Sequence, residues 1–108
     1  MNDNNDDKPA YMVICGTMLG EIDPEYTRRA KAVVIKTDAT PIAGGLVDTE
    51  QVELLEGELP PGSTFFAIEQ FRNKAAVNEF YYSEEYQSAI PLRKDSMQIK
   101  FAVVVEGL

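Results

Sequence analysis

Three segments of this sequence combine β-strand formers with apolar residues at both alternating sets of positions. They are residues 10–18, 64–71 and 98–106. In the last of them, Ile99 and Phe101 are expected on the same face of the strand. Because neighbouring side chains of a strand point to opposite faces, a strand that is apolar on both sides needs cover on both. Any sheet that this chain forms must therefore bury both of its faces.

Two further segments carry helix signals. Asp23 and Pro24 supply an N-cap and a proline at the first helical position, and apolar residues follow at helical spacing to residue 37. Asn73 can cap a second helix and Ser83 a third helical piece. Pro91 interrupts this second region, so two short helices are expected there rather than one long helix.

The segment between the two helical regions is glycine-rich and acidic. Gly44 and Gly45 predict a chain reversal, followed by an extended segment over residues 46–55 and a turn at residues 60–62. From residue 37 to residue 71 there is no Lys or Arg. The span holds seven acids, Asp38, Asp48, Glu50, Glu53, Glu56, Glu58 and Glu69. Their spacing matches no cation-binding loop, which favours a solvated acidic edge.

The order strand, helix, strand, strand, helix, strand predicts an α+β fold of the ferredoxin-like βαββαβ type over residues 9–108. The first and third strands then lie at the centre of a four-stranded antiparallel sheet, with the helices on one face. Residues 1–8 are expected to form a disordered acidic tail. No further element remains to cover the second face, which predicts a homodimer packed sheet to sheet, with a cavity either between sheet and helices or within the joined barrel.

The composition excludes several kinds of chemistry. The chain has no His, a single Cys and a formal charge of −8, from ten basic and eighteen acidic residues. These counts argue against imidazole catalysis, His-bound metals or haem, and binding to nucleic acid or anionic membranes. We expect no metal and no tightly held cofactor. The acidic start and the short apolar runs predict no secretory leader and no membrane span, and the unpaired Cys15 favours the cytoplasm.

Several short stretches resemble a bacterial family known as domain of unknown function 1330. Residues 56–61 are similar to the family's Glu-Gly-x-x-Pro-Pro turn, and residues 83–87 and 92–93 to its Ser-x-Glu-Tyr-Gln and Leu-Arg segments. Residues 105–107 resemble its closing strand. The resemblance implies a subunit of the dimeric α+β barrel superfamily and supplies no catalytic residues. That superfamily includes cofactor-free monooxygenases, isomerases and stress-responsive proteins, so the fold alone does not define a function.

The densest group of polar and aromatic residues contains Tyr81, Ser83, Tyr86 and Arg93. In one interpretation Ser83 caps a helix, the tyrosine rings pack, and Arg93 pairs with a carboxylate such as Glu85 or Glu69. In the other, these four residues bind a ligand, and Arg93 holds a carboxylate or enolate oxygen. A reaction at this place would use Tyr81, Tyr86 and Arg93 to stabilise an oxyanion, with Glu69 as the base.

Three functions follow as hypotheses. The first is a cytoplasmic homodimer that binds a small organic molecule without a metal or cofactor. The second is a cofactor-independent monooxygenase or isomerase that acts on an aromatic or enolisable substrate. The third is a structural or stress-associated dimer that has no ligand.

Overall fold

The computed structural model describes residues 8–108 and confirms the α+β, ferredoxin-like prediction. The elements are β1 (Ala10–Met18), α1 (Pro24–Thr37), β2 (Thr40–Leu46), β3 (Phe65–Phe71), α2 (Lys74–Tyr81), α3 (Glu84–Ala89), a short 3₁₀ helix η2 (Ile90–Arg93) and β4 (Met97–Glu106). The strands form one antiparallel sheet in the order β2-β3-β1-β4, with β1 and β3 at its centre as predicted. The expected acidic tail, apart from Lys8, lies outside the described residues.

Each helix begins at the cap that the sequence predicts. Asp23 accepts a hydrogen bond from the backbone N–H of Glu25 at 2.8 Å, at the start of α1. Asn73 caps α2 and Ser83 caps α3 in the same way. Pro91 lies in η2, so the second helical region is divided into short pieces as expected. These caps fix where the helices that carry the candidate site residues begin.

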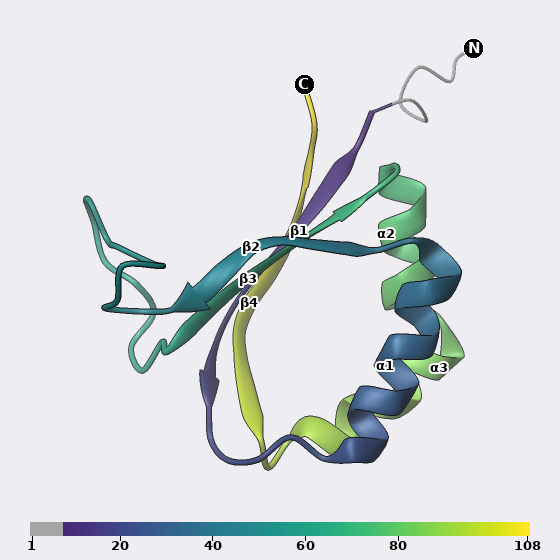
Figure 1. Ribbon diagram of the computed structural model, residues 1–108, viewed down its shortest axis with the longest axis horizontal. Coiled ribbons are helices and arrows are strands. Elements are labelled where there is room, and N and C mark those ends of the chain that lie inside the picture. Colours follow the sequence, from purple (N-terminus) through teal and green to yellow (C-terminus); the bar gives the residue numbers. More distant parts are fainter. Residues whose placement is uncertain (1–7) are drawn as a thin grey trace.

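The helices cover one face of the sheet, and the core lies between these two layers (Figure 1). Phe71 of β3 is fully buried and packs edge-to-face against Phe80 of α2, with ring centroids 5.5 Å apart. Val33 and Thr37 of α1 are also buried, and the Thr37 hydroxyl donates to the Val33 carbonyl at 2.7 Å. The apolar stripe predicted for α1 therefore faces the sheet.

The prediction for the second strand is wrong. β2 runs from Thr40 to Leu46, so Gly44 and Gly45 lie inside the strand and not at a chain reversal. Their φ angles are 153° and 151°, and a Cβ on Gly44 would lie 2.6 Å from the Phe66 carbonyl oxygen. Gly44 thus serves a close approach of two backbones, which is the other common role of glycine in a strand. A Cβ on Gly45 would instead collide with the Gln51 side chain. Residues 47–64 form a loop that contains only isolated bridges to Val52.

A bulge in β4 corrects a second prediction. Cys15 of β1 lies opposite Phe101, but the next residue, Gly16, lies opposite Ile99, so Lys100 is an extra residue in β4. Because a bulge changes the alternation of side chains, Ile99 joins Ala102 on the helix side while Phe101 faces the other way. Ile99 and Phe101 therefore do not share a face, contrary to the expectation from simple alternation.

The face of the sheet without helices, called here the open face, is apolar from edge to edge. Ala43, Ile68, Val13 and Val103 lie opposite one another in a row across all four strands. Val103 is 45% exposed. The loop of residues 47–64 approaches this face over β2 and β3, where its leucines line a hollow with Ile68. The chain thus covers part of the open face itself, which the sequence did not predict.

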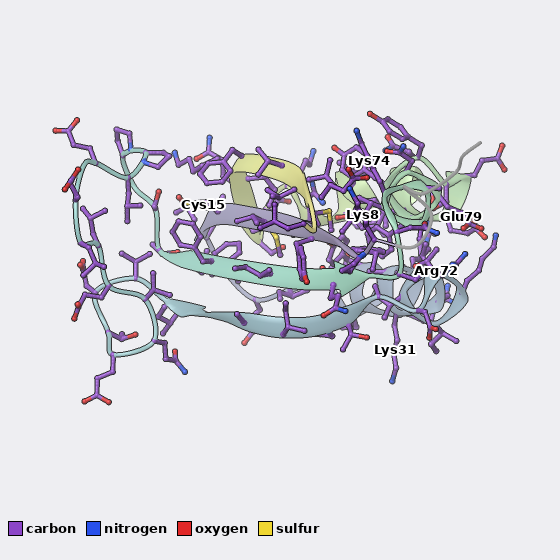
Figure 2. All side chains as sticks on the ribbon, turned by 90° about the horizontal axis from the view of Figure 1, so that it is seen from above. Lys8, Cys15, Lys31, Arg72, Lys74 and Glu79 are labelled. Atoms are coloured by element: carbon purple, nitrogen blue, oxygen red, sulfur yellow. The ribbon has the colours of Figure 1, made fainter. Side chains whose placement is uncertain are left out.

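Cys15 lies on the open face but is fully buried. Its thiol contacts the Ser63 hydroxyl at 3.3 Å. In Figure 2 it lies well away from Arg72, Lys74 and Glu79, which gather at the helical end of the molecule. Its burial is that of a small hydrophobic core residue. Within residues 8–108, the helices are all too short or too polar to span a membrane.

Candidate functional site

A cavity of about 190 Å³ lies between the sheet and the helix layer. The sheet forms its floor and the helices its roof, and Arg93 from η2 is the charged residue of the lining. The lining residues are Met12, Ile14, Phe65, Ala67, Met97, Ile99 and Ala102 from the strands, and Tyr26, Tyr81, Tyr86 and Arg93 from the helices. The site is therefore an apolar chamber with three phenol groups and one cation in its wall.

Three of these side chains form a hydrogen-bonded chain. The Arg93 guanidinium donates to the Tyr86 hydroxyl oxygen at 2.5 Å, and the Tyr86 and Tyr26 hydroxyls lie 3.1 Å apart. The guanidinium carbon also lies 5.7 Å from the centroid of the Tyr86 ring. Because the three residues come from α1, α3 and η2, this chain links separate pieces of the helix layer beside the cavity.

Both ends of the Arg93–Tyr86 contact keep their protons. Burial raises the pKa of the Tyr86 phenol well above its usual value, and the nearby Tyr26 hydroxyl adds to this, whereas Arg93 acts in the opposite direction. Burial lowers the pKa of Arg93, but its contacts with the Tyr86 and Tyr26 hydroxyls outweigh this, so its pKa is raised. Tyr86 is therefore a neutral phenol that accepts from a cation and has its own proton left to donate.

The prediction that Arg93 pairs with a carboxylate such as Glu85 or Glu69 is wrong. Glu85 lies 3.6 Å from Lys36 instead, and within residues 8–108 Arg93 makes no ion pair. The phenol of Tyr86 takes the place where a carboxylate was expected. The guanidinium charge therefore remains uncompensated by an acidic side chain of the described chain.

The structure brings together Tyr81, Tyr86 and Arg93 of the predicted residues. It leaves Glu69 outside the cavity lining, on β3 opposite Met12 and Pro41. Tyr26 was missed as a site residue, because its position in the apolar stripe of the first helix marked it only as core. A phenol in the first turn of a helix that faces the same layer as Tyr86 was the available signal.

Ser83 acts as a helix cap rather than as part of the cavity wall. Its hydroxyl accepts from the Tyr86 backbone N–H at 3.1 Å and donates to the Phe80 carbonyl at 2.9 Å. We expect Ser83→Ala to lower the free energy of unfolding by about 1 kcal/mol. Ser83→Asp should retain most of the stability, since Asp is an equally good cap. Urea unfolding of both variants measures this, and equal losses in the two would contradict the capping role.

Glu69 should make stability depend on pH. Burial raises its pKa above the ordinary value of 4.5. As the pH falls, the folded state binds a proton at Glu69 before the unfolded chain does. The contribution of Glu69 to stability is therefore fully present below the ordinary pKa and is lost as the pH rises through the raised pKa. Glu69→Gln should therefore stabilise the protein at neutral pH and change it less near the ordinary value of 4.5. Urea unfolding at both pH values tests this, with the exposed Glu56→Gln as control; equal effects at both pH values would refute it.

The fold and cavity together define a ferredoxin-like α+β protein with a small apolar chamber between its sheet and its helices. Residues 17–108 match the family described as a domain of unknown function, DUF1330. The chain belongs to this family, as the resemblance in the sequence implied. No curated protein matches the chain.

Solved structures share the fold at low sequence identity. A protein of unknown function from Rhodopseudomonas palustris is 14% identical with a TM-score of 0.65, over 95% of this chain and 83% of that one. A hydroxynitrile lyase from Passiflora edulis is 13% identical with a TM-score of 0.50, over 93% and 92%. A possible oxidoreductase from Bacteroides thetaiotaomicron is 10% identical with a TM-score of 0.51, over 93% and 98%. At these identities the likeness concerns the fold alone.

Proposed function

We propose that the protein binds a small organic molecule in the cavity between its sheet and its helices. The observation that carries this proposal is an apolar chamber with a few converging polar groups, which is the usual make-up of a ligand site. Its volume is about 190 Å³, below the roughly 300–1,000 Å³ of sites for drug-sized ligands. The ligand is therefore no larger than about one ring with a short substituent. Tyr81, Tyr86 and Arg93 contact it, and Ser83 acts by fixing the start of α3.

Binding is better supported than catalysis. A monooxygenase or isomerase that removes a proton from its substrate needs a base within hydrogen-bond reach. Among residues 8–108 the cavity lining includes no carboxylate, and Glu69, the predicted base, lies outside it. Tyr86 holds its proton tightly because burial raises its pKa. The wall is thus equipped to donate hydrogen bonds to a ligand rather than to accept a proton from it.

We further propose that two copies associate through their open faces, in the cytoplasm. The row of Ala43, Ile68, Val13 and Val103 supports this, because an apolar band across a whole sheet gains free energy when a second copy covers it. In a two-fold symmetric dimer the same surface patch of each copy meets its counterpart, so a single apolar face is sufficient to form the interface. The free thiol of Cys15 is compatible with a reducing compartment.

A thermal-shift screen with small ring compounds and short branched-chain compounds tests the ligand proposal. A compound that binds the native state raises Tm by mass action. Ala67→Leu places extra atoms in the cavity floor and should abolish the shift, at an overpacking cost of about 1–3 kcal/mol. Ala75→Leu makes the same change at an exposed position of α2 and should leave the shift intact. No shift with any compound would favour a dimer without a ligand.

A further inference from the structure

We propose that the ligand of the cavity is a small carboxylate with an apolar body, held by Arg93 and the Tyr26 hydroxyl. This inference rests on the proposed function, because it assigns a chemical class to the molecule bound there. Amines and other cations are excluded by the same arrangement. The inference depends on three features of the wall: a cation without an acidic partner, a chain of hydrogen bonds that starts from this cation, and an apolar floor.

The uncompensated cation is Arg93. A guanidinium carries five N–H donors, and the described chain offers them two neutral acceptors, the Tyr86 and Tyr26 hydroxyl oxygens, and no carboxylate. The side chain is partly buried against Tyr86 and makes no ion pair within residues 8–108. A charge that is withdrawn from water without a partner is costly. A carboxylate offers two oxygens in the geometry that a guanidinium binds best, so a bound carboxylate would offset the cost of withdrawing the Arg93 charge from water.

The hydrogen-bond chain starts from a group that can only donate. Arg93 has only protons to give, so the Tyr86 oxygen accepts from it. The Tyr86 and Tyr26 hydroxyls lie 3.1 Å apart and either can donate to the other. A carboxylate bound beside Tyr26 requires that Tyr86 donates to Tyr26, which leaves the Tyr26 proton for the ligand. In this arrangement both Arg93 and Tyr26 present donors to the chamber. The described lining contains no carboxylate that would accept from a ligand, so the wall selects an acceptor with negative charge.

The floor and the remaining wall select the body of the molecule. Ile14, Ile99 and Met12 line the chamber, together with Tyr81 from α2. Burial of an apolar ligand surface against these side chains is favourable, whereas their apolar atoms offer no hydrogen bonds to a polar surface. The chamber holds about 190 Å³, which suits a single ring or a short branched chain beside the carboxylate. Sugars and other molecules with many hydroxyls do not fit this lining.

The test measures binding by calorimetry with matched pairs of probes. Each pair is a carboxylate and its primary amide: benzoate and benzamide, phenylacetate and phenylacetamide, and 2-methylbutyrate and 2-methylbutyramide. We expect at least one carboxylate to bind about 10- to 100-fold more tightly than its amide, the usual range for one charged hydrogen-bonded contact. Arg93→Met should remove this preference while the amide still binds. Tyr26→Phe keeps the ring and should weaken the carboxylate about 5-fold.

A matched control separates local from general effects of charge. Arg72→Met removes one positive charge at the exposed Arg72–Glu79 contact, away from the cavity, and should keep the preference for the carboxylate. Tyr26→Phe preserves packing, so it serves if Arg93→Met does not fold. Amides that bind as tightly as carboxylates, or a preference that survives in both Arg93→Met and Tyr26→Phe, would overturn the carboxylate assignment and leave the proposed function intact. No binding by any probe, charged or neutral, would overturn both.

Discussion

Phe71→Ala is expected to lower the free energy of unfolding by about 3–5 kcal/mol, the range for removing a large aromatic side chain from a core. Phe71 is fully buried at the end of β3, opposite Ala10 of β1, and its ring packs edge-to-face on Phe80. The change leaves a cavity between sheet and α2 that the surrounding strands cannot close. For a domain with a total stability of about 5–15 kcal/mol, this loss removes a large part of it.

Urea unfolding followed by circular dichroism measures the effect of Phe71→Ala. Tyr82→Ala is the matched control, because Tyr82 lies at the end of α2 with 71% of its surface exposed. Its loss should change the stability by no more than about 0.5 kcal/mol. If both variants lost the same amount, the core would not lie between sheet and helices as described.

Val103→Lys is expected to prevent self-association, with a dissociation constant raised at least about 100-fold. Val103 ends the apolar row across the open face and is 45% exposed, so a longer polar side chain fits the single chain without strain. In a sheet-to-sheet dimer the same position is buried, and an unpaired ammonium there costs about 3–5 kcal/mol. By symmetry each dimer carries this change twice.

Analytical ultracentrifugation over a range of concentrations measures the association. Ile35→Lys is the control: Ile35 lies on the outer side of α1, with 71% of its surface exposed, and the same kind of change there should leave the dimer intact. A wild-type chain that sediments as a monomer at micromolar concentration would refute the dimer. A Val103→Lys variant that still dimerises would show that the interface does not lie on the open face.

Local signals predicted most of the fold. Asp23, Asn73 and Ser83 each stand before a helix that they cap, so the helix starts were readable from single residues. The second strand was not readable in this way. A Gly-Gly pair is typical of a turn, which is why the sequence predicted a reversal at Gly44 and Gly45. Their place in β2 becomes clear only from the neighbouring strand β3, whose backbone would collide with a Cβ on Gly44. That information lies in a residue far along the chain.

The candidate site was only partly predictable for a related reason. Tyr81, Tyr86 and Arg93 lie within a short stretch of sequence, and their pattern drew attention to them. Tyr26 lies 60 residues from its hydrogen-bond partner Tyr86, and nothing in the sequence connects the two. Glu69 shows the opposite error: the sequence offered it as the base without defining which face of the sheet it occupies, and the structure places it outside the cavity lining.

The protonation of Tyr86 and Arg93 has a consequence for where and when the protein would act. Burial raises the pKa of the Tyr86 phenol, and contacts with the two phenols raise the pKa of Arg93. Both groups therefore keep the same protonation state throughout the pH range of a living cell. The chain has no histidine, the side chain whose ordinary pKa lies near neutrality, and Glu69, whose pKa burial raises, lies outside the cavity lining. Occupancy of the chamber would then report the concentration of its ligand and remain indifferent to swings in cellular pH.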